Sequence, residues 1–412
     1  MSGRIRPLRM ALALLSLLIL TLTGCWDLRE VEDLGYVMAM AVDRAPGNKV
    51  RVIVQIPNPR VVGGGGPRGG ITPAASIAAK PYRNHEGTGA TMFDAIRGIA
   101  QESSRRLFFA QNRTLIIGER MARTGLMDVL DFLSRSVEIR RHLTMVFVAH
   151  GDLATILDVP NPHDATPAIR IDDIVKWRGQ SSRFAPVPLS RFLELLSLEG
   201  AEPFAGVIEA VPNATRRPEI GEKLAPEPNR TIRLRGAALF RNDRLVGFLN
   251  EAETRGLLWV LNEVRGGQTV FPVPGGMPGD QAAVEILRAR ASVKPEIADG
   301  KIVMRVKIFE EGNLAEVEGA VDVSRPEVLR ELERAHAAAI RREVMAALRK
   351  AQAVGSDAFC FGEAFRREFP KEWKKIKRNW PELFRDLEVR IQVDARIRRT
   401  GMIGKPRPIL SP

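Results

Sequence analysis

The chain has 412 residues, of which 45% are hydrophobic and 27% are charged, and its formal net charge at pH 7 is +13. This composition is ordinary for a globular protein and provides enough core for two or three domains. Its two cysteines exclude a fold that depends on several disulfides.

The first 24 residues have the order of a lipoprotein signal peptide. Three arginines within the first nine residues precede an apolar run over residues 10–23, and small residues lead directly to Cys25. The run has 14 residues, whereas a membrane-spanning helix needs roughly 20. We therefore expect removal of residues 1–24 and transfer of a diacylglyceryl group to the Cys25 sulfur. The freed amino group can then take an N-acyl chain.

This processing would leave 388 residues with a net charge of +10, because the three leader arginines are lost. Such a charge suits an anionic partner. For an exported and tethered chain we expect lipid head groups rather than nucleic acid. Cys360 would remain as a single thiol, and its place between Phe359 and Phe361 predicts a buried small side chain rather than a reactive one.

The N-terminal domain is expected to cover residues 25–160 and to alternate strands with helices. The apolar patterns predict strands at 34–42, 50–56, 112–118 and 143–149, and helices at 91–103 and 125–134. The glycine-rich segment 63–70 lacks the Gly-Lys-Ser/Thr ending of a phosphate-binding loop, so we expect a plain loop there. His142 and His150 flank the last strand and are expected to be structural.

The breaker cluster at 160–163 predicts the start of a middle domain, residues 161–275. Asn250 is a natural N-cap for a helix that begins with Glu251 and Glu253 and ends at the glycine pair 266–267. The remaining predicted elements are helices at 169–177 and 189–198, a strand at 204–211, a surface loop at 212–228, and a hairpin of strands 232–240 and 245–249 around a turn at 241–243.

A Pro/Gly linker at 271–280 is expected to lead into a C-terminal α+β domain, residues 276–400. It should combine an antiparallel sheet with a long helix at 326–354, capped by Ser324 and ended by Gly355. The remaining predicted elements are strands at 283–293 and 301–309 joined around Asp299 and Gly300, helices at 359–369 and 371–380, a strand at 387–397, and a tail at 401–412. The expected fold class is therefore multi-domain α+β, with mixed sheets and packed helices.

Motifs for chemistry are missing from the sequence. It contains no Gly-x-Ser-x-Gly elbow, His-Glu-x-x-His or Cys-x-x-Cys pair, complete phosphate loop or EF-hand loop. Carboxylates are plentiful, but their order marks no catalytic pair. We expect no catalytic residue, no metal and no cofactor, and hence a protein that is not an enzyme.

One basic and aromatic segment, residues 371–380, allows two interpretations. On a helix, Trp373 and Trp380 share a face with Ile376. In the first interpretation the tryptophans pack in a core and the basic side chains are merely solvated. In the second, the basic face contacts an anionic membrane or a partner. The side chains that would do so are Lys371, Lys374, Lys375, Lys377 and Arg378.

Three segments carry a family resemblance. The opening Cys-Trp-Asp-Leu-Arg-Glu from Cys25, followed by an apolar strand that ends at Asp43, resembles the start of Ger(x)C (GerAC-type) spore germination lipoproteins. Residues 236–264, with LVGFLNEAETRGLLWVLNEV, look like the family's central signature, whose conserved C-terminal half begins near 231. Residues 355–403, with GSDAFCFGEAFRREFPKEWKKIKRNW and VDARIRRTGMI, are similar to its C-terminal signature.

The resemblance implies the C subunit of a nutrient germinant receptor. Such a protein is lipid-anchored on the outer face of the spore inner membrane and works beside A and B type integral membrane subunits without catalysis. Only the lipidated cysteine carries over, to Cys25. Cys360 stands where we expect a glycine in this motif. Two alternatives stay open, namely an extracytoplasmic substrate-binding lipoprotein that captures the nutrient directly and a lipid-anchored enzyme acting on cell wall.

Overall fold

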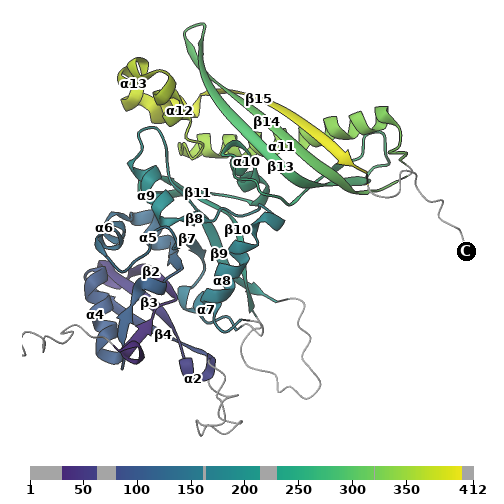
Figure 1. Ribbon diagram of the computed structural model, residues 1–412. Helices are drawn as coiled ribbons and strands as arrows, with labels where there is room; N and C mark the ends of the chain where they lie inside the picture. Colours follow the sequence, from purple (N-terminus) through teal and green to yellow (C-terminus); the bar gives the residue numbers. More distant parts are fainter. Residues whose placement is uncertain (1–29, 63–79, 161–163, 214–229, 320, 401–412) are drawn as a thin grey trace, which may run out of the picture.

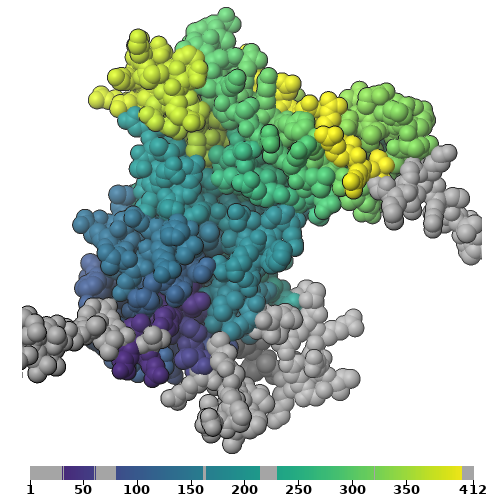
Figure 2. Space-filling model, viewed as in Figure 1, coloured from purple at the N-terminus to yellow at the C-terminus, as the bar shows by residue number. Residues whose placement is uncertain are grey.

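The computed structural model describes residues 30–62, 80–160, 164–213, 230–319 and 321–400. It contains a nine-stranded sheet, a four-stranded sheet and one small two-stranded sheet, with helices packed on both large sheets. Figure 1 shows the two large sheets as separate layers, one above the other, and Figure 2 shows the C-terminal part projecting sideways beyond the part beneath it. The expected α+β class with mixed sheets is confirmed.

The nine-stranded sheet has the order β11-β10-β9-β7-β6-β2-β3-β4, with β8 added on β7. The four central strands, β9, β7, β6 and β2, run parallel to one another. Antiparallel strands extend the sheet on both sides, with β10 and β11 beyond β9 and with β3 and β4 beyond β2. The strands are β2 (Ala39–Ala45), β3 (Lys49–Pro57), β4 (Tyr82–Gly89), β6 (Thr114–Ile117), β7 (Met145–His150), β8 (Val187–Pro188), β9 (Phe204–Pro212), β10 (Arg230–Arg241) and β11 (Arg244–Leu249).

Both faces of this sheet are covered, which explains why its central strands read as continuous apolar runs. Met40 and Val42 of β2 pack toward one core, and the alternate residues Ala39 and Ala41 pack toward the other. The first face carries α4 (Met92–Glu102), α5 (Glu119–Thr124), α6 (Met127–Arg135) and α9 (Leu189–Ser197). The second face carries α7 (Leu153–Leu157) and α8 (Pro167–Lys176), and a short α2 (Pro59–Val62) follows β3.

The single strand expected at 34–42 is wrong. The backbone N–H of Val37 donates to Phe108, whereas that of Met38 donates to Gln55, so the chain changes partners between these two residues. The first part, β1 (Leu34–Tyr36), pairs in parallel with β5 (Arg106–Phe108), and only the second part, β2, enters the large sheet. An apolar pattern does not record which neighbour each residue pairs with, so it could not predict this change.

The four-stranded sheet consists of β12 (Gln268–Pro272), β13 (Gln281–Ala298), β14 (Lys301–Val317) and β15 (Glu388–Arg399). β13 and β14 form the antiparallel pair that was expected, and β12, which was not expected, lies antiparallel to β13. β15 instead lies parallel to β14, because the long helix α11 (Pro326–Val354) and the helices after it return the chain to the starting end of the sheet. These later helices are α12 (Phe361–Glu368), α13 (Pro370–Ile376) and α14 (Trp380–Arg385).

Several local predictions are confirmed. Asn250 caps α10 (Glu251–Val260) with a complete capping box, in which its side chain accepts from the Glu253 N–H and Glu253 accepts from the Asn250 N–H. Gly355 ends α11 in the left-handed conformation, with φ of 68°. Asp299 and Gly300, both at positive φ, form the tight turn between β13 and β14.

Other local predictions are wrong. Ser324 does not cap α11, because its hydroxyl donates to Asp322 and the N-cap position falls on Arg325. The helix that starts after Asn250 ends at Val260, before the glycine pair. The expected linker at 271–280 begins inside β12, which pairs with β13. The expected helix at 371–380 is divided between α13, a 3₁₀ turn at Lys377–Asn379 and α14.

The predicted domain boundaries near 160 and 275 stay predictions. The nine-stranded sheet takes strands from both sides of residue 160, and one hydrophobic core reaches from Val37 to Ala395. Segment 63–70, most of the loop at 212–228 and the tail at 401–412 lie outside the described residues. Within the described residues, no helix combines the length and the apolar character that crossing a bilayer requires.

Candidate functional site

The predicted lipid-attachment residue, Cys25, lies outside the described residues, so its modification stays a prediction. The five basic residues of the 371–380 segment are described, and all five side chains are exposed. Lys377 forms an ion pair with Glu199 at 2.9 Å. The structure does not bring these basic residues together with any other predicted site residue.

The two tryptophans of this segment are buried, with 3% of Trp373 and 4% of Trp380 exposed. Their ring centroids lie 5.4 Å apart. The indole N–H of Trp373 donates to Glu199 at 2.9 Å, and that of Trp380 donates to Asp357 at 3.0 Å. This arrangement agrees with core packing of the aromatic side chains, and a membrane or partner role for the exposed lysines remains a prediction.

The helix α12, which precedes this segment, contacts the chain just before β9 through two glycines, Gly362 and Gly200. A Cβ at Gly200, where φ is +80°, would lie 2.6 Å from the carbonyl carbon of Gly362, so the two backbones touch. The N–H of Glu363 donates to the Gly200 carbonyl at 2.9 Å. Buried Asp357 accepts from the N–H groups of Phe361 and Gly362, and its burial raises its pKa to about 6. Several residues of the C-terminal signature therefore serve to pack α12 against the rest of the protein.

Cys360 directly precedes α12 and adopts the left-handed conformation, with φ of 59° and ψ of 32°. Glycine enters this region without steric cost, which gives a physical reason for the glycine expected there. Cys360 is partly buried, and burial raises the pKa of its thiol to about 12. The thiol is therefore protonated and unreactive at neutral pH.

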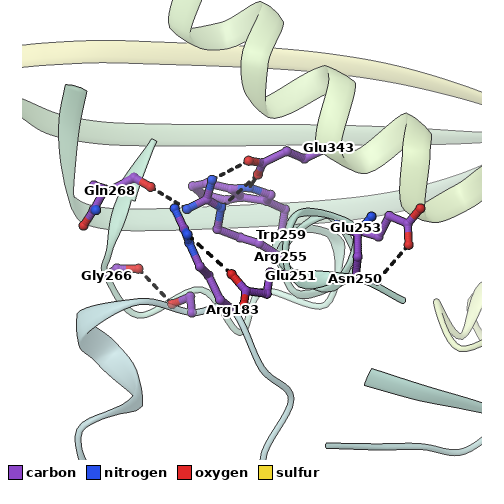
Figure 3. Close-up of polar contacts among 10 residues, drawn as sticks. Arg183, Asn250, Glu251, Glu253, Arg255, Trp259, Gly266, Gln268 and Glu343 are labelled. Atoms are coloured by element: carbon purple, nitrogen blue, oxygen red, sulfur yellow. Dashed lines mark hydrogen bonds and ion pairs between the residues drawn. The ribbon is translucent and has the colours of Figure 1, made fainter. Parts of the chain in front are cut away.

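A cluster of buried, hydrogen-bonded polar side chains lies where α10 packs against α11 (Figure 3). We call this contact between the two helices the junction. Arg255 on α10 and Glu343 on α11 form an ion pair through two hydrogen bonds, of which the Nε–Oε2 bond is 2.9 Å long. Their side chains are only 5% and 13% exposed. The indole N–H of Trp259 donates to the same Glu343 carboxylate at 3.0 Å, and Arg255 also donates to the Gln268 carbonyl.

Gly256 explains how the two helices come so close. A Cβ at this position would lie 2.2 Å from the backbone oxygen of Glu343, so only glycine allows the contact. Glu343 is thus contacted by three residues from two turns of α10. It forms an ion pair with Arg255, a close backbone contact with Gly256 and a hydrogen bond with Trp259. The junction connects the end of the hairpin β10–β11 to the four-stranded sheet.

A second set of contacts surrounds the junction. The hydroxyl of Ser182 donates to the Gly266 carbonyl at 2.8 Å, and Arg183 lies 3.4 Å from Glu251 at the start of α10. Figure 3 shows the contact between Arg183 and Glu251 beside the Arg255–Glu343 pair. The segment before β8 is therefore held against both ends of the α10 region.

A cleft of about 790 Å³ opens beside the junction. It is lined from the nine-stranded sheet by Arg235 and Phe248, and from α11 by Lys350 and Glu343. Its walls carry both charges, and within the described residues no group of three or more His, Cys, Asp or Glu side chains is arranged for a metal ion. His150 also lines it, with Nδ1 3.7 Å from Glu119.

A further buried pair on α11 was missed by the sequence analysis. His336 and Glu310 of β14 are both fully buried, with Nδ1 and Oε2 3.4 Å apart, and the Phe271 ring stacks on the imidazole at 5.3 Å. This distance allows an ion pair, but burial favours the uncharged forms. Burial, with a contribution from Glu311, raises the pKa of Glu310 to about 8.

Burial likewise lowers the pKa of His336 to about 4, with a smaller contribution from Arg255. At neutral pH the pair is therefore a protonated carboxyl beside a neutral imidazole. A signal was present in the sequence, because Val306, Ile308 and Glu310 alternate on one face of β14. That alternation places Glu310 on the buried side.

Two family models match this chain, and together they cover most of it. The family described as "Spore germination protein N-terminal domain" matches residues 27–210, and the family described as "Spore germination B3/GerAC like, C-terminal" matches residues 235–401. Together, these two matches cover most of both large sheets.

Individual relatives agree over nearly the whole length. Spore germination protein KC of Bacillus subtilis (strain 168) is 27% identical over 96% of this chain and 97% of the relative. Spore germination protein B3 of the same organism is 23% identical over 94% and 97%. The crystal structure of the GerBC protein shares the fold, with a TM-score of 0.54 at 18% identity over 87% of this chain and 96% of that one. The chain belongs to the GerAC-type family of germinant receptor C subunits, and the resemblance found in its sequence is confirmed.

Proposed function

We propose that this protein is a lipid-anchored, non-enzymatic subunit of a spore nutrient germinant receptor. In this proposal it sits on the outer face of the spore inner membrane and docks with A and B type integral membrane subunits. The observation that carries the proposal is the match to the family along both large sheets, combined with a leader that ends at Cys25.

The energetics of the anchor support the proposal. One acyl chain holds a protein only marginally, whereas two chains, at about 0.8 kcal/mol per buried CH₂, hold it stably. A diacylglyceryl group on Cys25 supplies two chains. The tether also confines the folded part to a thin layer beside the membrane subunits, so a modest interface suffices to keep the receptor assembled.

The proposal is tested by Cys25→Ala in spores, with Cys360→Gly as the matched control. Cys360 is the second cysteine of the chain, and its φ of 59° accommodates glycine. We expect Cys25→Ala to leave the membrane fraction, to keep the unfolding midpoint of the parent chain, and to abolish nutrient germination through this receptor. Cys360→Gly should stay on the membrane and germinate normally. Full release of Cys25→Ala with normal germination would refute the proposal.

A further inference from the structure

A groove of about 890 Å³ lies between α4 and α6, helices that Figure 1 shows on the same side of the nine-stranded sheet. Three large apolar side chains stand along it unusually exposed, namely Phe93 at 54%, Met127 at 58% and Val137 at 100%. Apolar side chains scattered singly on a surface need no explanation, but a contiguous set around a concave floor marks an interaction site.

The floor of this groove is buried, and its walls carry aromatic contacts. Ile96 and Phe109, each 8% exposed, form part of the floor and belong to the main core. Phe93 contacts Phe132 with ring centroids 6.5 Å apart, and the Arg97 guanidinium lies over the Phe93 ring at 4.9 Å. A channel between two helices with an apolar floor is the shape into which an amphipathic helix lays its apolar face.

The rim of the groove favours an acidic occupant. Asp131 is already paired with Arg135 at 2.8 Å, and Glu138 accepts from the N–H of Phe109. Arg44, Arg97 and Arg106 have no carboxylate partner among the described residues, whereas two rim carboxylates, Asp128 and Glu138, have no cation partner there, so three unpaired cations stand against two unpaired carboxylates. The uncompensated charge is therefore positive, which complements acidic side chains flanking an apolar stripe.

The groove also lies close to β1, the first strand of the described chain. Leu107 of β5 lines it, and β5 pairs with β1, whose first residue is Leu34. Leu34 lies nine positions after Cys25, an extended length of at most about 32 Å. If the chain is anchored at Cys25, this length keeps β1, and with it the β5 side of the groove, within reach of the layer in which the segments of an integral membrane partner emerge from the bilayer.

We propose that the α4–α6 groove is the docking site for an acidic amphipathic helix of a membrane subunit of the receptor. This inference rests on the proposed function, since it takes the partner from there. A lipid surface fits less well, because the apolar side chains surround a concave floor and the rim includes three carboxylates, which anionic head groups repel.

The test uses the full chain in membranes that contain its receptor subunits. A photoreactive amino acid replaces Phe93, and the control carries it at Met277, which is 77% exposed in the turn between β12 and β13. We expect a crosslink to a membrane subunit from position 93 and none from position 277. Crosslinks from position 93 to lipid alone, or to a second copy of this chain, would overturn the proposal.

A pair of variants gives an independent readout. Phe93→Asp and Val137→Asp change exposed side chains, so we expect an unchanged unfolding midpoint and at least a tenfold loss of membrane subunits recovered with the chain. Met277→Asp should recover them normally. If the groove variants recover the subunits at parental yield, the groove proposal is wrong and the proposed function stands. If the parent chain itself recovers no membrane protein, the proposed function fails as well.

Discussion

The helix α11 contributes one residue to each of two buried polar pairs, Glu343 with Arg255 and His336 with Glu310, and the two pairs differ in how they are satisfied. Glu343 is paired with Arg255 through two hydrogen bonds and also accepts from Trp259. His336, two turns earlier on the same helix, faces Glu310 without any hydrogen bond made by either side chain among the described residues. One pair is satisfied and joins two parts of the molecule, whereas the other lies within the C-terminal part and stays uncharged.

The difference shows what burial demands of charge. A buried ion pair is tolerated when its geometry is excellent and additional hydrogen bonds satisfy its atoms. Arg255 and Glu343 meet that requirement with help from Trp259 and the Gln268 carbonyl. His336 and Glu310 do not, so their pKa values move until both groups are neutral. The first pair fixes how the parts assemble, and the second makes stability depend on pH.

Breaking the junction pair should have the largest effect. Glu343→Ala leaves the buried Arg255 charge without its partner, which costs about 3–5 kcal/mol in comparable buried pairs. The free energy of unfolding, measured with urea, should fall by that amount. Glu327→Ala is the control on the same helix, because its pair with Arg325 is exposed to solvent and contributes little to stability. Equal losses for the two variants would mean that the junction pair does not hold the parts together.

Filling the helix contact should have a smaller effect. Gly256→Ala places a Cβ against the Glu343 backbone oxygen, and overpacking of this kind costs about 1–3 kcal/mol. Gly98→Ala is the matched control in α4, because nothing lies within 4 Å of a Cβ there. That change should stabilise the protein by up to about 1 kcal/mol through helix propensity. Thermal unfolding midpoints that move in the same direction for both variants would contradict the close approach.

The uncharged pair predicts a pH dependence between pH 6.5 and 8. Over most of this window native Glu310 keeps its proton, which it begins to lose as the pH approaches its pKa of about 8, while the unfolded chain, with the ordinary carboxyl pKa of 4.5, has already lost it. Stability from this group therefore falls as pH rises, by about 1.4 kcal/mol per pH unit at most and about 2 kcal/mol in all. Below pH 6.5 the depressed pKa of His336 acts in the opposite sense and offsets part of the change.

Glu310→Gln should remove this contribution. The difference in unfolding free energy between pH 6.5 and pH 8 should shrink by about 2 kcal/mol relative to the parent chain. Glu316→Gln, on the exposed end of the same strand, serves as the control and should leave the difference unchanged. An undiminished pH dependence in Glu310→Gln would show that Glu310 ionises normally in the folded protein.

Local patterns predicted much of the fold. Apolar spacing located α4, α8, α9 and α11, and turn chemistry located the Asp299–Gly300 hairpin and the Asn250 capping box. The order of strands was not predictable in this way. β7, for example, lies between β6 and β9. These neighbours are determined by how helices pack on both faces of the sheet, and the sequence of β7 itself carries no signal for them. The parallel placement of β15 likewise depends on the return path through α11.

The junction itself could not be predicted, because Arg255 and Glu343 are separated by 88 positions. A glycine in the middle of a strongly apolar helix was the one available sign of a close approach at Gly256. The anchor has the opposite character. Its evidence is entirely local, in the order of charge, apolar run and small residues before Cys25.

The measurement that tests the account most directly is mass spectrometry of the N-terminal peptide of the protein from spore membranes. The account predicts a mature chain that begins at Cys25 and carries a diacylglyceryl group on sulfur. A chain that retains residues 1–24, or one that begins at Cys25 with an unmodified thiol, would contradict it.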